Sequence, residues 1–361
     1  MNITTRRHTR RHLLLAAAAL AGLTGLAACS DDNKSEPATT EAPASSEAPA
    51  STEAPAGKVL KVALLTPGLT NDGSFNQVAL EGIQKLKDEG LVEFEVREKL
   101  ADPAASEPVI REYATKGYDL IIGHGIELSE PILKVAAVFP AVPFAASGGP
   151  DLEAKLLANV DGWTYDFAQQ GYLNGWVAGK IAGVTKVGAV GGPELPFILA
   201  AHKGFALGLK ETNPAATIVE TFTGSFDDVQ KAVEATKGQV AQGAQIVWTS
   251  GDGIGNGVAA AAKEAKIFTL GVTGDAGGVA KEVNIASVEL DMYPTYKAYV
   301  DDINAGTFGK KFFVSGLANA GLILTPINPV DPAVPADIQA QVEQLVADLV
   351  SGAKVLPNFY A

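Results

Sequence analysis

From Lys58 onward, short aliphatic or β-branched segments alternate with longer segments whose apolar residues recur at helical spacing. Eight of the short segments are candidate strands: Val59–Leu65, Val92–Arg97, Leu120–Gly123, Val142–Ala145, Lys186–Val190, Thr217–Phe222, Gln245–Thr249 and Ile267–Leu270. Phe75–Glu89 and Val229–Gln242 are examples of the amphipathic helices expected between them. Alternation of strand and helix predicts an α/β fold with parallel sheets covered on both faces.

The candidate strands form two sets with almost the same spacing. Successive starts in the first set are 33, 28 and 22 residues apart, and in the second set 31, 28 and 22 residues apart. This repetition predicts two similar lobes. The length of 361 residues agrees, because domains average roughly 150 residues.

The loops that follow the candidate strands combine glycine with short polar side chains. They are Pro67–Asn76, His124–Glu127, Ser147–Gly149, Gly191–Pro193, Gly224–Phe226, Ser250–Gly253 and Thr273–Asp275. Ligands of open parallel sheets bind beyond the carboxyl ends of the strands. Similar turns cap helices in most α/β proteins, so the seven loops form one site only if the two lobes face each other.

Thirteen residues are candidate ligand contacts. Eleven lie in or near these loops, namely Asn71, Asp72, Phe75, Asn76, His124, Ser147, Phe197, Phe226, Asp252, Thr273 and Asp275, and Trp163 and Asp291 lie elsewhere in the chain. Phe75 offers a face on which a flat ring can stack, or it begins a helix and packs inward. Asn71 and Asp72 either meet the ligand or cap that helix. His124 either bonds the ligand or supports the loop, and Asp252 suits a hydroxyl or an amine.

The N-terminal residues have the features of an export signal. Basic residues between Arg6 and Arg11 precede the apolar segment Leu13–Leu26, which as a helix of 14 residues spans only about 21 Å. Residues 1–28 are therefore expected to be a signal peptide. Leu26–Cys29 resembles the lipobox before a lipid-modified cysteine, although an ordinary signal cleaved nearby would leave Cys29 as a free thiol. Thr9–Leu14 also resembles a twin-arginine motif, which leaves the export route open.

A linker of low complexity separates the predicted signal from the lobes. Ala, Pro, Ser, Thr and Glu occupy 23 of the 28 positions from 30 to 57. Such a segment has no large apolar side chains to offset its ordering entropy. Residues 29–57 are therefore expected to be a lipidated cysteine followed by a disordered tether.

Charge and composition exclude several functions. The net charge is −13, which argues against nucleic acid as a partner, because phosphates require clustered Lys and Arg. Cys29 is the single cysteine, so neither a disulfide framework nor a cysteine zinc site is expected. Beyond the signal, only His124 and His202 remain as histidines. The chain is thus expected to be no enzyme, to hold no metal and to need no cofactor.

An ordered series of motifs runs through the lobes. It comprises Lys61–Leu65, Asn71–Asn76, Gly171–Leu173, Lys186–Gly192, Gly204–Phe205, Ser225–Asp228, Ser250–Gly257 and Ser351–Pro357. The series resembles the basic membrane protein family, which are lipid-anchored substrate-binding proteins of ABC importers and include purine nucleoside receptors. The resemblance covers essentially all of 58–361.

This resemblance implies a periplasmic-binding-protein-like fold of type I, with two Rossmann-like lobes joined by a hinge. The first lobe would comprise 58–164 and about 284–305, and the second 165–283 and about 306–361. The chain would cross between the lobes near Gly162–Asp166 and again beyond Gly274. The lobes would close on a small-molecule ligand, with Phe75 stacking on a base, and a monomer held on the extracytoplasmic face of the membrane would deliver the ligand to an ABC permease.

Three positions depart from the nucleoside-binding pattern. Thr273 stands where such relatives carry the acidic residue that grips ribose, and Ser147 stands near the place of a second acidic residue. The lysine expected after Ser287–Val288 is absent before Lys297. Either Asp275 and Asp291 take over these contacts, or the ligand is a base without sugar or another small polar ring compound. A ligand-sensing receptor for a signalling partner remains an alternative to transport, with an extracytoplasmic enzyme less favoured.

Overall fold

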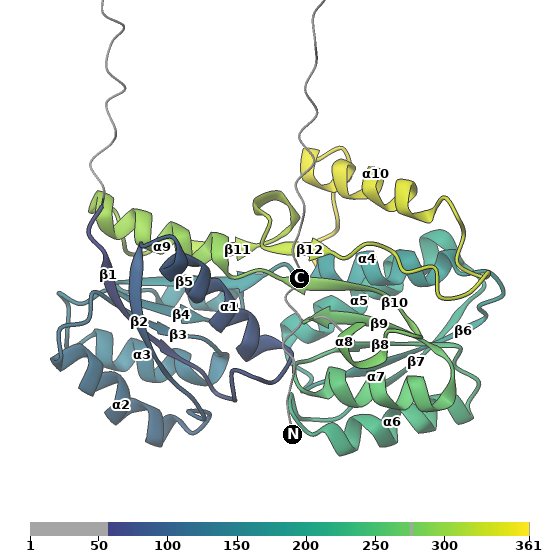
Figure 1. Cartoon of the computed structure of the whole chain (residues 1–361), viewed down its shortest axis with the longest axis horizontal. Helices are drawn as coiled ribbons and strands as arrows, with labels where there is room; N and C mark the ends of the chain where they lie inside the picture. The colour runs from purple at the N-terminus through teal and green to yellow at the C-terminus, as the bar shows by residue number, and fades with distance from the viewer. Residues whose placement is uncertain (1–56, 275–276, 361) are drawn as a thin grey trace, which may run out of the picture. The chain divides into compact units, whose positions relative to one another are not determined.

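The computed structural model describes residues 57–274 and 277–360, which build two α/β lobes (Figure 1). The predicted signal peptide, Cys29 and the tether up to residue 56 lie outside the described residues, as does Asp275. Within the described part of the chain, no helix combines the length and the apolar character needed to cross a bilayer.

Each lobe contains a sheet of six strands. The first sheet, in spatial order, is β11 (Phe312–Ser315), β5 (Val160–Tyr165), β4 (Phe144–Ser147), β3 (Leu120–Gly123), β1 (Leu60–Leu65) and β2 (Val92–Arg97), all parallel. The second is β12 (Leu322–Leu324), β10 (Asn284–Leu290), β9 (Phe268–Thr273), β8 (Ile246–Ser250), β6 (Lys186–Gly191) and β7 (Thr217–Phe222). Only the edge strand β12 runs antiparallel to its neighbour. The predicted α/β class with parallel sheets is confirmed.

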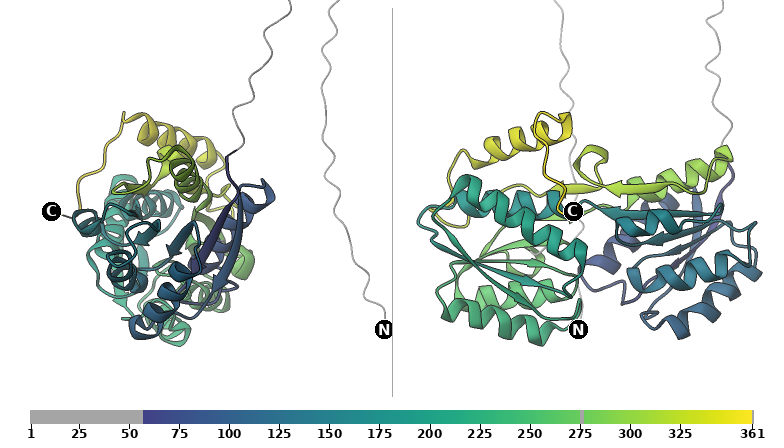
Figure 2. Two further views of the ribbon diagram at one scale, coloured as in Figure 1. Left: turned by 90° about the vertical axis from the view of Figure 1, so that its left-hand side faces the viewer. Right: turned by 180° about the vertical axis from the view of Figure 1, so that it is seen from behind.

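Helices cover both faces of each sheet (Figure 2). Those of the first lobe are α1 (Phe75–Asp88), α2 (Pro103–Thr115), α3 (Ser129–Ala136) and α9 (Tyr293–Ala305). Those of the second are α4 (Phe167–Lys180), α5 (Pro196–Thr212), α6 (Val229–Ala241), α7 (Ile254–Ala265), α8 (Gly277–Ala280) and α10 (Ile338–Ser351). Short 3-10 helices occupy Ile126–Leu128, Pro150–Lys155 and Leu317–Asn319.

The expected lobe boundaries differ from the sheets in two places. β10 was expected in the first lobe with residues 284–305, but it pairs with β9 in the second sheet. β11 was expected in the second lobe with residues 306–361, but it pairs with β5 in the first sheet. The chain thus crosses between the lobes after β5, after β10 and after β11. The strands that pair in a sheet lie far apart in the sequence. The local pattern of apolar residues therefore could not show that β10 and β11 belong to the opposite lobes.

Glycine allows α4 and α5 to pack with their backbones in contact. A Cβ atom on Gly175 would lie 2.0 Å from the carbonyl oxygen of Phe205, and one on Gly208 would lie 2.2 Å from that of Tyr172. Side chains between the helices would hold them further apart. This close pair, which lies on one face of the second sheet, therefore depends on the absence of side-chain atoms at these glycines.

We expect Gly175→Ala to destabilise the fold, because the added methyl group meets backbone rather than a flexible side chain. Overpacking of this kind costs about 1–3 kcal/mol. Gly238→Ala in α6 is the matched control, since a Cβ atom added there would have no neighbour within 4 Å and Ala exceeds Gly in helix propensity by about 1 kcal/mol. Urea unfolding of both variants measures the effect. Equal stabilities for the two variants would contradict the packing argument.

Candidate functional site

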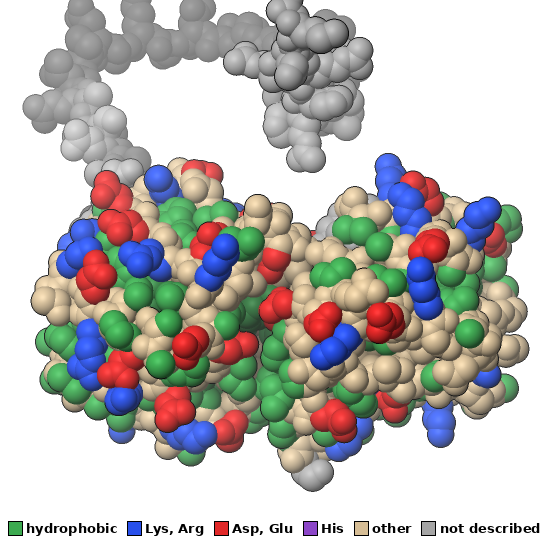
Figure 3. All heavy atoms as spheres, turned by 90° about the horizontal axis from the view of Figure 1, so that it is seen from below, with side chains coloured by type: hydrophobic (Ala, Val, Ile, Leu, Met, Phe, Trp, Pro, Cys, Tyr) green, Lys and Arg blue, Asp and Glu red, His purple; other side chains and the backbone are tan. Residues whose placement is uncertain are grey.

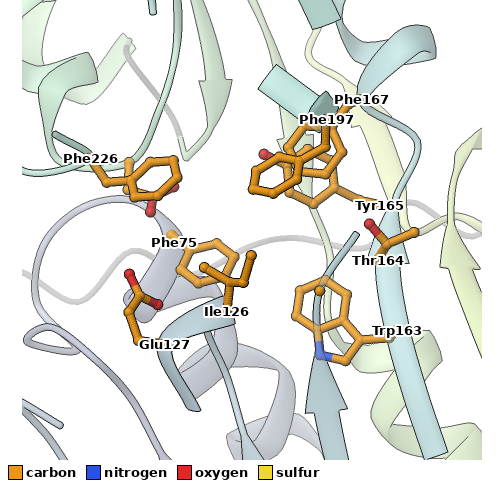
Figure 4. A pocket seen from close by; sticks show the side chains of 11 residues that line it. Phe75, Ile126, Glu127, Trp163, Thr164, Tyr165, Phe167, Phe197 and Phe226 are labelled. Carbon is orange, nitrogen blue, oxygen red and sulfur yellow. The ribbon is translucent and has the colours of Figure 1, made fainter. Parts of the chain in front are cut away.

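A cavity lies between the lobes (Figure 4). Its lining combines six aromatic side chains with two carboxylates and small or aliphatic residues: Phe75, Ile126, Glu127, Gly148, Trp163, Thr164, Tyr165, Phe167, Phe197, Phe226 and Asp252. Five of the expected contact residues are among them, namely Phe75, Trp163, Phe197, Phe226 and Asp252. The two lobes therefore do bring several of the loops together.

The aromatic rings of the cavity come from both lobes. Phe75 and Trp163 of the first lobe are nearly parallel, with ring centroids 6.3 Å apart and an interplanar angle of 22°. Phe167 continues this wall into the second lobe, with its centroid 3.6 Å from that of Tyr165 and 4.7 Å from that of Phe197. Figure 4 shows Phe226 on the opposite side from Trp163. A flat ring between these faces would be enclosed by aromatic surface.

Asp72 holds the loop that presents Phe75. Its Oδ1 accepts hydrogen bonds from the backbone N–H of Ser74 and Gln77, at 2.9 and 3.0 Å. Its Oδ2 accepts from the backbone and side-chain amides of Asn76, at 3.1 and 2.7 Å. Asp72 and Asn76 therefore fix the start of α1 and do not line the cavity. Asn71 is exposed and also lies outside the lining.

His124 lies behind Phe75 and is fully buried. Its Nε2 lies 2.9 Å from the carbonyl oxygen of Phe75, and its Nδ1 lies 2.9 Å from the hydroxyl of Tyr296. A carbonyl only accepts, so Nε2 carries the proton and the hydroxyl of Tyr296 donates to Nδ1. The imidazole ring also contacts both aromatic side chains, with its centroid 4.0 Å from that of Phe75 and 5.2 Å from that of Trp163. The structure places His124 as a support for the aromatic wall rather than in the lining.

Three further expected contacts, Ser147, Thr273 and Asp291, are not among the residues that line the aromatic cavity. The Ser147 hydroxyl accepts from the backbone N–H of Gly125 at 2.7 Å and steadies the loop that follows His124. Asp291 accepts from the backbone N–H of Tyr293 at 2.8 Å, at the start of α9. Thr273 and Asp291 line a different cavity, beside α1. Of the two aspartates expected to compensate for the departures, Asp291 is thus outside the aromatic lining, and Asp275 lies outside the described residues.

Two carboxylates border the aromatic cavity without a basic partner. Within the described residues, neither Glu127 nor Asp252 forms an ion pair, and no Lys, Arg or His lines the cavity. Burial raises the pKa of Asp252 well above its usual range, and the charges of Asp227, Glu127 and Asp72 raise it further. Burial also raises the pKa of Glu127. Part of the Asp252 side chain is still exposed, because it borders the cavity. Its pKa is nevertheless raised by burial, because protein atoms surround it on its other sides.

Sequence reasoning missed part of the lining, mainly Glu127, Thr164 and Phe167. Glu127 belongs to a loop that was identified, and only His124 was chosen from it. Thr164 lies on β5, and Phe167 begins α4 directly after it. β5 was not predicted as a strand, because its sequence interrupts the apolar run with Asp161 and Gly162. Its aromatic residues Trp163 and Tyr165 were the available signal.

The lobes also touch beside the cavity. The Asn256 side-chain amide in α7 donates to the backbone carbonyl of Asp72 at 2.9 Å. A Cβ atom on Gly274 would lie 2.2 Å from the carbonyl oxygen of Gly73, so the two backbones meet there. The preceding Thr273 has a φ of 66°, which is strained for a β-branched residue. The loops after β1 and β9 therefore form a direct contact between the lobes.

The state of His124 predicts a pH dependence of stability. Burial lowers its pKa to about 3, whereas in an unfolded chain it is about 6.5. The neutral His124 therefore contributes fully to the free energy of unfolding above pH 6.5. Below that pH the free energy of unfolding falls by about 1.4 kcal/mol for each pH unit, because the unfolded chain binds a proton that the folded chain does not. In His124→Phe this loss is absent, although the variant is less stable at pH 7 because Phe75 and Tyr296 lose a partner. Between pH 6.5 and 5, the difference in unfolding free energy between the wild-type chain and His124→Phe should therefore narrow by about 2 kcal/mol. A gap that stays constant in urea titrations would contradict a buried neutral imidazole.

Comparison with known proteins identifies the family. Residues 59–342 match the family described as ABC transporter substrate-binding protein PnrA-like. Basic membrane protein A1 of Borrelia garinii is 25% identical over 304 residues, which cover 83% of this chain and 89% of that protein. The ABC transporter nucleoside-binding protein BmpA of Lactococcus lactis is 25% identical, with coverage of 97% and 99%.

A solved structure is similar in both sequence and fold. It is the solute-binding protein of an ABC transporter system from Conexibacter woesei, which is 51% identical. The match covers 84% of this chain and 100% of the other, with a TM-score of 0.73. The expected periplasmic-binding-protein-like fold is confirmed. The chain belongs to the PnrA-like family of ABC transporter substrate-binding proteins, to which the basic membrane proteins also belong.

Proposed function

We propose that this protein captures a small flat ring compound between its lobes and delivers it to an ABC permease. The ligand is of the purine base or nucleoside class or a related polar ring compound. The observation that carries the proposal is the enclosure of one cavity by six aromatic side chains from both lobes. A flat ring of any chemical type can stack on an aromatic face, and each stacked ring contributes about 1–3 kcal/mol to the binding free energy.

The hinge supports a capture mechanism without chemistry. Phe75 and Trp163 belong to the first lobe, whereas Phe197 and Phe226 belong to the second. A ligand that contacts all four stabilises the arrangement in which the lobes are together. It shifts the equilibrium only by the difference in its affinity for the open and closed arrangements. The three crossings after β5, β10 and β11 are the places where such a hinge motion would occur.

The ribose contacts of a nucleoside lack support in the aromatic cavity. Thr273 and Asp291 line another cavity, and Ser147 is engaged with Gly125. A hydrogen bond to a charged partner contributes roughly 1.5–3 kcal/mol. A free base or another sugar-free ring compound therefore suits the cavity better than a nucleoside does.

We expect flat ring compounds to stabilise the full chain thermally, after purification in detergent through a denaturing step that removes carried-over ligand. The panel contains purine bases, nucleosides, pyrimidines, sugars and amino acids. A ligand at one hundred times its Kd adds about 2.7 kcal/mol of stability. Phe226→Ala should lower the affinity by 5- to 150-fold, since about 1–3 kcal/mol of stacking is lost.

Phe94→Ala is the matched control for the stacking variant. Phe94 and Phe226 are both half-buried, but Phe94 lies on β2 and does not line the cavity. The control should retain wild-type affinity. Stabilisation by sugars or amino acids and not by ring compounds would contradict the proposed ligand class.

Lipid anchoring at Cys29 completes the proposal. The family is extracytoplasmic and associated with membranes, and Leu26–Cys29 has the pattern of a lipobox. Several acyl chains on one residue would hold the protein stably, whereas one chain gives only marginal binding. The tether from residue 30 would then let a monomeric body reach its permease.

We expect Cys29→Ser to move the protein from the membrane fraction to the soluble extracytoplasmic fraction, because the acyl acceptor is lost. Metabolic labelling with a radioactive fatty acid should mark the wild-type chain and not the variant. Ser30→Ala is a control beside the cysteine and should change neither result. Membrane retention of Cys29→Ser at wild-type levels would contradict the anchor.

A further inference from the structure

We infer that the ligand of the aromatic cavity is a small aromatic cation, held by Glu127 and Asp252 together with the surrounding ring faces. This inference rests on the proposed function and specifies the charge of the captured ring. It starts from the composition of the lining, in which aromatic faces and carboxylates occur together and, among the described residues, no basic side chain is present.

The two carboxylates come from different lobes. Glu127 follows β3 in the first lobe, and Asp252 follows β8 in the second. Closure brings their charges towards each other, and Asp72 and Asp227 add further negative charge near Asp252. Like charges placed together in a partly desolvated space repel each other, so each carboxyl there favours its protonated form. A cation between them favours the ionised form of both carboxyls and is attracted by both, so its binding favours closure.

Acidic side chains also lie outside the cavity. Figure 3 shows them on both sides of the groove that separates the lobes on that face, with basic side chains among them. The whole chain carries a net charge of −13. A negative net field raises the local concentration of ligands of the opposite sign. The approach of a cation is therefore favoured as well as its binding.

Aromatic faces add a second attraction that is specific for cations. The negative face of each ring attracts a positive charge within about 6 Å of its centroid, with about 2 kcal/mol or more when water is excluded. Phe75, Trp163 and Phe226 present rings to the same space (Figure 4). A flat cation gains from these faces both by stacking and through its charge, whereas a neutral ring gains by stacking alone.

Unpaired hydroxyls supply an independent sign of a polar ligand. The Thr164 hydroxyl lines the aromatic cavity, and within the described residues it is buried without a hydrogen-bond partner. The same holds for Thr249, which lines a smaller cavity that shares Asp252 with the aromatic one. Buried polar groups are normally satisfied. N–H groups of a cationic ligand would satisfy both hydroxyls as well as the carboxylates.

The test compares cations with neutral compounds of nearly the same shape. Isothermal titration of the full chain in detergent, freed of carried-over ligand by unfolding and refolding, measures Kd for benzamidine against benzamide and for 1-methylnicotinamide against nicotinamide. Adenine and adenosine form the neutral purine arm. We expect each cation to bind at least 10-fold more tightly than its neutral partner.

Charge-neutralising variants connect this preference to the named side chains. Asp252→Asn and Glu127→Gln keep the shape of the side chain and should each reduce the preference for the cation by at least 10-fold, with little change for the neutral compound. Glu130→Gln removes the same charge three residues from Glu127, at an exposed position outside the lining. This control should keep the wild-type preference.

The outcomes separate this inference from the proposed function. Tight binding of neutral purines with no preference for cations would overturn the inference and leave the proposed function standing. A preference that survives both neutralising variants would also overturn it. Absence of binding by every ring compound, neutral or cationic, would overturn both.

Discussion

The site depends on one constraint, which is that two parallel sheets direct their carboxyl edges at the same space. The chain meets this constraint by crossing between the lobes after β5, β10 and β11. The first of these crossings leaves β5 at its carboxyl end beside the cavity, where Thr164 and Tyr165 line it. Phe167 begins α4 directly after the first crossing and packs against Tyr165. The connections that join the lobes thus also provide part of the wall that the ligand would meet.

The sequence allowed the strands to be predicted where the apolar run was continuous. Val92–Arg97, Leu120–Gly123 and Thr217–Phe222 were placed with the correct bounds. β5 was missed because Asp161 and Gly162 interrupt its apolar run. The buried Asp161 carboxylate accepts hydrogen bonds from the backbone N–H groups of Gly309 and Lys311, just before β11. Such compensation comes from a distant part of the chain, and local periodicity therefore cannot reveal it.

Residues of the candidate site were predicted best where the side chain has no hydrogen-bonding atoms. Phe197 and Phe226 lack hydrogen-bonding groups and line the cavity as expected. Asp72, Asn76 and His124 have polar atoms that serve either a ligand or the fold. The structure uses them for the fold, because backbone amides and the Tyr296 hydroxyl lie within reach. Which use prevails depends on atoms far away in the sequence, so both alternatives had to stay open.

The same competition applies to the polar positions that the family resemblance associates with ribose. The chain carries Thr273 and Ser147 there, and the Ser147 hydroxyl already accepts from the backbone N–H of Gly125. The aromatic walls remain, and the free carboxylates of Glu127 and Asp252 border those walls. Unpaired charge in a desolvated cavity is costly unless a partner of opposite sign enters. This balance of aromatic faces and carboxylates is the physical basis of the proposed preference for a charged ring.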